Sequence, residues 1–279
     1  MADLENARRR SAQELADLQL REALRLDWPA RQWRLAAAIF AVCLSAWEIG
    51  ARTGTIPALA FPAPSVICRA ILRLLQNGTL GTHLTATLLR MSAGLAVGGA
   101  AGLLAGLLMG WSTRLRAFVD PVIAAAHPVP KIAILPLIML IFGIGESSKV
   151  MVIALAAFFP MMISTMTGVR QISPVYFEVA ANYGADRKQI FTRVIFPGSL
   201  PFVLSGLRLA LNSALLLTIA VELVSSQQGL GAMIWFAWET LRTEDLYAAL
   251  AITALLGISG NILLQWLASR LVPWQVERG

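Results

Sequence analysis

Charged side chains are scarce in this sequence: Asp, Glu, Lys and Arg make up 14% of the 279 residues, whereas hydrophobic residues make up 57%. So little charge argues against a large soluble domain and is typical of a polytopic membrane protein. The two cysteines, Cys43 and Cys68, lack the spacing of a metal or redox site. The two histidines, His83 and His127, lie far apart, and no HExxH or Ser-His-Asp pattern accompanies them. We therefore expect no catalytic site and no metal site.

The hydrophobic residues form runs long enough to cross a bilayer, which takes about 20 residues per helix. Six spans are expected, at residues 34–51, 84–110, 117–143, 148–169, 199–224 and 246–268. The connecting segments on one side hold 15 Lys and Arg residues, against five on the other. Because the richer side faces the cytoplasm, the sequence predicts an all-α, multi-pass protein with both termini inside. The net charge of +7 then reflects membrane topology rather than nucleic-acid binding.

The longest polar interruption, residues 173–198, lies between the fourth and fifth spans. Gly184 can adopt the left-handed conformation that ends a short helix. Asp186 and Gln189 have the spacing of a capping box at the start of a second helix, which Pro197 is expected to end. The segment should therefore form a rigid helix-turn-helix on the cytoplasmic side.

This loop carries a signature. Glu178, Ala180, Gly184 and Pro197 match the pattern E-A-A-x-x-x-G-x(n)-P, with Val179 in place of the usual first alanine. The chain thereby resembles the permease subunits of bacterial ABC importers, and the stretch 127–149 is similar to the subgroup that takes up taurine, aliphatic sulfonates, nitrate and related small anions. The resemblance implies a type I importer transmembrane domain of six helices in the bacterial inner membrane.

The resemblance also implies the partners. The loop would be a coupling helix that docks on a cytoplasmic ATPase dimer, which would bind ATP and Mg, while this chain would bind no cofactor. The absence of a phosphate-binding loop agrees with that division, because Gly143–Lys149 lacks the Gly-Lys-Ser/Thr that such a loop requires. A second permease copy would complete the path, and a periplasmic or lipid-anchored binding protein would deliver the solute. The coupling residues would be Glu178, Ala180, Ala181, Gly184, Ala185 and Pro197.

The third span is the least lipid-like, because prolines and two basic side chains, His127 and Lys131, interrupt it. Broken, charged segments are tolerated in a membrane where they are buried in protein or line a water-filled path. The two side chains could therefore attract a passing anion, or they could lie near the membrane surface and pair with lipid headgroups. Asn212 and Glu222 in the fifth span are further path candidates, with interhelical hydrogen bonding as the alternative for Asn212 and the outer membrane interface for Glu222.

Glycines recur every four residues along the second span. Such a stripe lets another helix approach closely in lipid, so we expect helix packing there. Its members are Gly94, Gly98, Gly102, Gly106 and Gly110.

The expected domain layout has three parts. Residues 1–33 are expected to form a cytoplasmic amphipathic segment. Within it, Ser11 and Glu14 have the spacing of a capping box ahead of the amphipathic stretch. Residues 34–268 form the permease domain, and residues 269–279 form a cytoplasmic tail.

Two other functional classes compete with the importer. An ion-coupled secondary transporter usually has internal repeats and intramembrane carboxylates, whereas this sequence shows no repeat and its carboxylates lie toward the ends of spans. A passive membrane anchor would not need a broken third span. Within the importer class, an aromatic acid or a pyrimidine precursor is an alternative solute.

Overall fold

The computed structural model describes residues 28–57 and 59–273, and these form two compact units, residues 1–65 and 66–279. In the first unit, α2 (Trp28–Arg52) is apolar enough from Arg34 onward to span a membrane. Glu48 accepts hydrogen bonds from the Ser65 backbone N–H (3.0 Å) and hydroxyl (2.7 Å), which ties α2 to the residues that follow it. The amphipathic segment and capping box predicted within residues 1–27 lie outside the described residues.

The second unit consists of helices, and the described residues contain no strand. Its helices are α3 (Pro64–Gln76, which begins in the first unit), α4 (Thr79–Trp111), α5 (Thr113–Ala126), the 3₁₀ helix η1 (Lys131–Ile134), α6 (Leu135–Phe142), α7 (Glu146–Arg170), α8 (Pro174–Asn182), α9 (Arg187–Ile190), the π-helix η2 (Phe191–Ile195), α10 (Phe196–Ser225), α11 (Leu230–Glu239) and α12 (Thr243–Leu271). Among the described helices, five are long and apolar enough to span a membrane singly, and the count is six if the bent pair α5 and η1–α6 forms one span. The predicted all-α, multi-pass architecture is therefore confirmed, with five or six spans.

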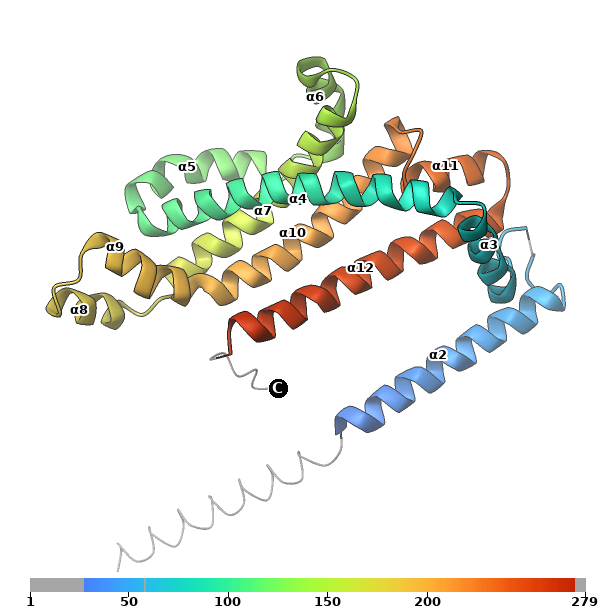
Figure 1. The fold of residues 1–279 in the computed structure, drawn as a ribbon, viewed down its shortest axis with the longest axis horizontal. Coiled ribbons are helices and arrows are strands. Elements are labelled where there is room, and N and C mark those ends of the chain that lie inside the picture. The colour runs from blue at the N-terminus through green and yellow to red at the C-terminus, as the bar shows by residue number, and fades with distance from the viewer. Residues whose placement is uncertain (1–27, 58, 274–279) are drawn as a thin grey trace, which may run out of the picture. The chain divides into compact units, whose positions relative to one another are not determined.

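Helix α7 is the centre of the bundle and packs against both α4 and α10 (Figure 1). The glycine stripe of α4 faces α7 along its length. A Cβ atom would lie 2.0 Å from the Ala154 carbonyl oxygen if added at Gly98, and 2.5 Å from the Phe158 carbonyl oxygen if added at Gly102. The two backbones are therefore too close for any residue larger than glycine at these positions. In lipid the hydrophobic effect contributes little to the association of helices. This close packing therefore stabilises the contact between α4 and α7.

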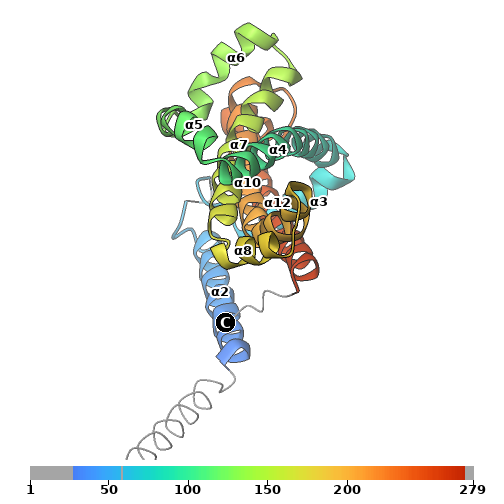
Figure 2. The same cartoon turned by 90° about the vertical axis from the view of Figure 1, so that its left-hand side faces the viewer.

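The third predicted span is broken, as expected. Helix α5 ends at Ala126, and the pair η1–α6 continues from Lys131 at an angle of 89°. The residues between include Pro128 and Pro130, which cannot donate backbone hydrogen bonds. Figure 2 shows α5 and α6 standing to one side of the bundle of α4, α7 and α10.

The loop after α7 has the predicted first turn. Gly184 has φ +70°, and Asp186 and Gln189 make both hydrogen bonds of a capping box. The prediction for Pro197 was wrong, because α9, η2 and α10 form one helical run that passes through it. In η2 the Phe196 N–H donates to the Phe191 carbonyl, five residues back. This wider turn accommodates the proline ring, which would clash with the preceding turn of a regular α-helix.

Helices α8 and α9 lie at one end of the second unit, and α11 lies at the other (Figure 1). These are called the α8 end and the α11 end below. Helix α3 is amphipathic, with Ile67, Ala70 and Leu74 buried. Helix α11 carries Trp235 and Trp238.

Candidate functional site

Helix α8 presents an apolar surface at the α8 end of the bundle. Val175, Tyr176, Val179 and Tyr183 are between 48% and 87% exposed. On the other side of the helix, Phe177 packs against the buried cluster of Leu107, Val169 and Ile195. Residues 175, 179 and 183 are spaced by four and therefore share one face of a helix. The sequence analysis noted Val179 only as a departure from the signature, although this spacing was readable.

The signature residues lie on and just after α8. Glu178, Ala181 and Gly184 are exposed, whereas Ala180, Ala185 and Pro197 are half-buried. The Ala185 N–H donates to the Ala180 carbonyl (2.9 Å), and the Gly184 N–H donates to the Ala181 carbonyl (2.9 Å). These bonds close the helix at a residue with positive φ, which favours glycine. The arrangement gives a short, capped helix whose exposed face includes one carboxylate and a strip of apolar side chains.

Two of the four path candidates lie together. His127 and Lys131 line a cavity of about 410 Å³ with Phe159 of α7 and Ser213 of α10. The Lys131 ammonium lies 4.7 Å from the centre of the Phe159 ring and donates to the His127 carbonyl. The cavity is otherwise lined mainly by apolar residues, so the ammonium is its main charge.

The other two candidates lie elsewhere. The Asn212 side-chain oxygen accepts a hydrogen bond from the side-chain amide of Asn261 in α12 (2.8 Å). This is the interhelical hydrogen bond given as the alternative role of Asn212. Glu222 is 0% exposed and pairs with Arg90 of α4.

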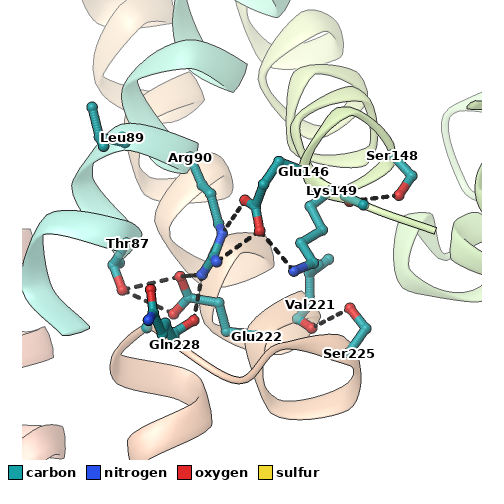
Figure 3. Close-up of polar contacts among 12 residues, drawn as sticks. Thr87, Leu89, Arg90, Glu146, Ser148, Lys149, Val221, Glu222, Ser225 and Gln228 are labelled. Atoms are coloured by element: carbon teal, nitrogen blue, oxygen red, sulfur yellow. Dashed lines mark hydrogen bonds and ion pairs between the residues drawn. The ribbon is translucent and has the colours of Figure 1, made fainter. Parts of the chain in front are cut away.

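Glu222 belongs to an ion cluster near the α11 end, shown in Figure 3, in which Glu222 and Arg90 are buried and Glu146 is exposed. Arg90 of α4 donates from Nη1 to Glu222 Oε1 (2.8 Å) and from Nη2 to Glu146 Oε1 (2.9 Å) at the start of α7. Thr87 donates to Glu222 Oε2 (2.9 Å), and Lys149 donates to Glu146 (2.9 Å). One guanidinium therefore joins α4, α7 and α10, with its side chain only 8% exposed. Buried charges need such partners because the desolvation cost is otherwise uncompensated.

The same cluster holds the chain between α10 and α11. The Gly231 N–H donates to Glu222 Oε2 (3.0 Å), the Leu230 N–H donates to the Thr87 hydroxyl (2.8 Å), and Arg90 donates to the Gln228 carbonyl. A Cβ atom at Gly229 would lie 2.2 Å from the Glu222 carboxyl carbon. The start of α11 is therefore fixed to α4 and α10 by side-chain bonds. The cluster can therefore lock the α11 end.

The sequence analysis missed Arg90 as a site residue. A signal was present, since Arg90 and Glu222 are opposite charges inside two different predicted spans, and intramembrane charges pair with one another. The sequence does not show which charges are partners, because 132 positions separate these two. Among the described residues, no group of three or more His, Cys, Asp or Glu side chains could hold a metal.

Comparison with known proteins identifies the family of this chain. Residues 98–276 match the family described as "Binding-protein-dependent transport system inner membrane component". The chain is 36% identical to the taurine transport system permease protein TauC of Escherichia coli, over 91% of this chain and 94% of the relative. It is 33% identical to the putative aliphatic sulfonates transport permease protein SsuC of Bacillus subtilis, over 87% and 88% of the two chains.

A third relative carries a different solute in its name. The formylaminopyrimidine transport permease protein ThiX of Halalkalibacterium halodurans is 34% identical over 86% of this chain and 95% of its own length. Among solved structures, a chain of the inward-facing MetNI methionine ABC transporter superimposes with a TM-score of 0.58 at 19% identity, covering 69% of this chain and 94% of that chain. That likeness supports the fold predicted from the signature loop.

The family match covers most of the transmembrane domain, and the relatives align over nearly their whole length. A permease of this family is a transport subunit rather than an enzyme, and it works in the inner membrane with an ATPase and a binding protein. The chain belongs to the binding-protein-dependent inner membrane components, the permease subunits of ABC importers.

Proposed function

We propose that this permease imports a small organic oxyanion, with an aliphatic sulfonate or taurine as the leading solute. The support is the likeness to TauC and SsuC over most of the chain, together with basic side chains at the break in the third span. Nitrate, a small inorganic oxyanion, is a further candidate. The likeness to ThiX favours a second candidate, a pyrimidine precursor.

The proposed assembly contains two copies of the permease, an ATPase dimer that binds ATP and Mg, and an external binding protein. The α8 end faces the cytoplasm together with both termini, because the basic residues concentrate on that side. The observation that carries the proposal is α8 itself, a capped helix that exposes Tyr176, Val179 and Tyr183 to solvent at the end of the bundle. Exposed apolar strips of this kind are typical of protein interfaces.

The geometry suggests how motion would reach the membrane. Helix α8 is anchored to the bundle through Phe177, and the helical run that follows extends from Arg187 to Ser225. Closure of the ATPase dimer would push on α8 and tilt α10, which packs against α7. Such a rigid connection suits alternating access, in which the path opens to one side and then to the other. His127 and Lys131 would then attract the anion within the path.

The choice of solute can be tested with the complete transporter, reconstituted in liposomes with its ATPase and binding protein. We expect taurine or an alkanesulfonate to stimulate ATP hydrolysis and to accumulate inside vesicles in an ATP-dependent manner. Nitrate and formylaminopyrimidine are the comparison solutes. Stimulation by formylaminopyrimidine alone would replace the leading solute with the second candidate, and transport without the ATPase would contradict the importer mechanism.

The coupling role predicts the behaviour of two loop variants. Glu178→Lys reverses the exposed charge of α8, and Gly184→Pro is incompatible with the observed φ of +70°. Both should insert normally in the membrane, because neither residue is buried. We expect each to weaken ATPase binding by at least about tenfold, since an interface charge and its supporting backbone are lost. Pull-down of the ATPase and vesicle uptake measure the effect.

Glu239→Lys is the matched control for charge reversal, because Glu239 is exposed on α11 at the opposite end. It should bind the ATPase like the wild type. Wild-type ATPase binding and uptake by both loop variants would contradict the coupling role of α8.

A further inference from the structure

Arg208 is a charged side chain in the middle of a membrane-spanning helix. It is the thirteenth of the 30 residues of α10, about 18 Å along the axis from Phe196 at 1.5 Å per residue. Within the described part of the chain, no carboxylate pairs with it. Arg90 in α4, by contrast, has two carboxylate partners. A cation inside the membrane without a carboxylate partner among the described residues can be met by an anion from outside the chain.

The surroundings of Arg208 are two adjoining cavities between α10 and α12. One has a volume of about 620 Å³ and also contains Ser205, Gln265 and Ser269 in its wall. The other has a volume of about 780 Å³ and is mostly apolar. Arg208 and Gln265 line both cavities. Both volumes fall in the range of about 300–1,000 Å³ that is usual for small-molecule sites.

The polar residues around Arg208 follow a regular pattern. Residues 205, 208 and 212 share one face of α10, and residues 261, 265 and 269 share one face of α12, since each set is spaced by three or four. The Asn212–Asn261 hydrogen bond ties the two faces together beside the cavities. Ser205 and Ser269 donate their hydroxyl protons to carbonyls of their own helices. Of these polar side chains, the guanidinium of Arg208 and the amide of Gln265 are left to meet a ligand.

We propose that Arg208 and Gln265 form an intramembrane site for a tetrahedral oxyanion group between α10 and α12. A guanidinium presents N–H donors in a planar fork that matches two oxygens of a sulfonate or phosphate, and the amide supplies a further donor beside it. The anion is either the sulfonate of the transported solute, in which case the inference rests on the proposed function, or the phosphate of a lipid headgroup.

The test uses the permease–ATPase complex in nanodiscs of phosphatidylcholine, with taurine and methanesulfonate as probes of equilibrium binding. Arg208→Gln should lower the affinity for both probes by about tenfold or more, as expected for loss of a charged hydrogen bond. Gln265→Leu should have a smaller effect in the same direction. Arg114→Gln is the control, because it removes an exposed arginine from the first turn of α5, outside both cavities.

A second arm separates the two sources of the anion. With phosphatidylglycerol added, native mass spectrometry counts the lipids retained by each variant. Loss of a bound phosphatidylglycerol in Arg208→Gln, with probe binding unchanged, supports the site and assigns it to lipid. Loss of probe binding assigns it to the solute.

Two results would overturn the inference. One is unchanged probe and lipid binding in Arg208→Gln. The other is dissociation of the permease pair in that variant, which would identify a carboxylate of the second copy as the partner. Failure of the proposed function is seen separately, as absence of sulfonate-stimulated ATP hydrolysis in the wild-type transporter.

Discussion

Arg90→Met should destabilise the permease by about 3–5 kcal/mol, the cost of leaving a buried charge without its partner. The methionine fills much of the volume of the arginine, so the loss comes from electrostatics rather than from a cavity. Glu222 would remain 0% exposed with only Thr87 and the Gly231 N–H as donors. The free energy of unfolding of the purified protein, measured by denaturant titration in mixed micelles, checks the value.

A second substitution isolates the buried charge as the cause. Arg90→Met combined with Glu222→Gln removes both charges while keeping an acceptor for Thr87. The double variant should be more stable than Arg90→Met alone by about 0.5–3 kcal/mol, the usual range for coupled neighbours. Arg52→Met is the control, because the Arg52 side chain is 65% exposed and its pair with Glu48 should contribute about 1 kcal/mol or less. A loss of under about 1 kcal/mol for Arg90→Met would show that the cluster does not hold the α11 end.

Much of the fold follows from local features of the sequence. Hydropathy predicted the spans, because a helix that crosses lipid needs an uninterrupted apolar length whatever its neighbours are. Gly184 and the pair Asp186–Gln189 predicted the turn after α8, since left-handed backbone and helix capping involve residues a few positions apart. The prediction for Pro197 was wrong because it also depended on a local rule. The rule that proline ends a helix assumes a regular preceding turn, and the π-helix η2 provides a wider one.

The candidate sites were predictable to different degrees. The coupling loop was predicted because its signature is contiguous, whereas its exposed apolar strip was readable but overlooked. The Arg90 cluster could not be assembled, because the partners Glu146 and Glu222 lie 56 and 132 positions away. Arg208 lies inside the fifth predicted span, where a charge is costly, but only the structure shows that α12 supplies Gln265 beside it. Pairings between helices depend on rotation and register, which a single sequence leaves open.

Gly98→Ala should be damaging although it adds a single methyl group. The added Cβ would lie 2.0 Å from the Ala154 carbonyl oxygen, a backbone atom that cannot move aside without shifting α7. Because α7 packs against both α4 and α10, the shift would spread through the bundle. Overpacking of this kind costs about 1–3 kcal/mol and occasionally more. We expect a lower free energy of unfolding in mixed micelles and less folded protein in the membrane.

The neighbouring residue provides a matched control for the same chemical change. At Gly99 the nearest atom to an added Cβ is the Leu95 Cδ1, at 4.0 Å, so the methyl group fits. Alanine also favours a helix over glycine by up to about 1 kcal/mol. Gly99→Ala should therefore be neutral or slightly stabilising, and Gly98→Ala should be the clearly less stable of the two. Equal stability of the two would mean that α4 and α7 do not pack through this face, and the glycine stripe would then need another partner, such as the second permease copy.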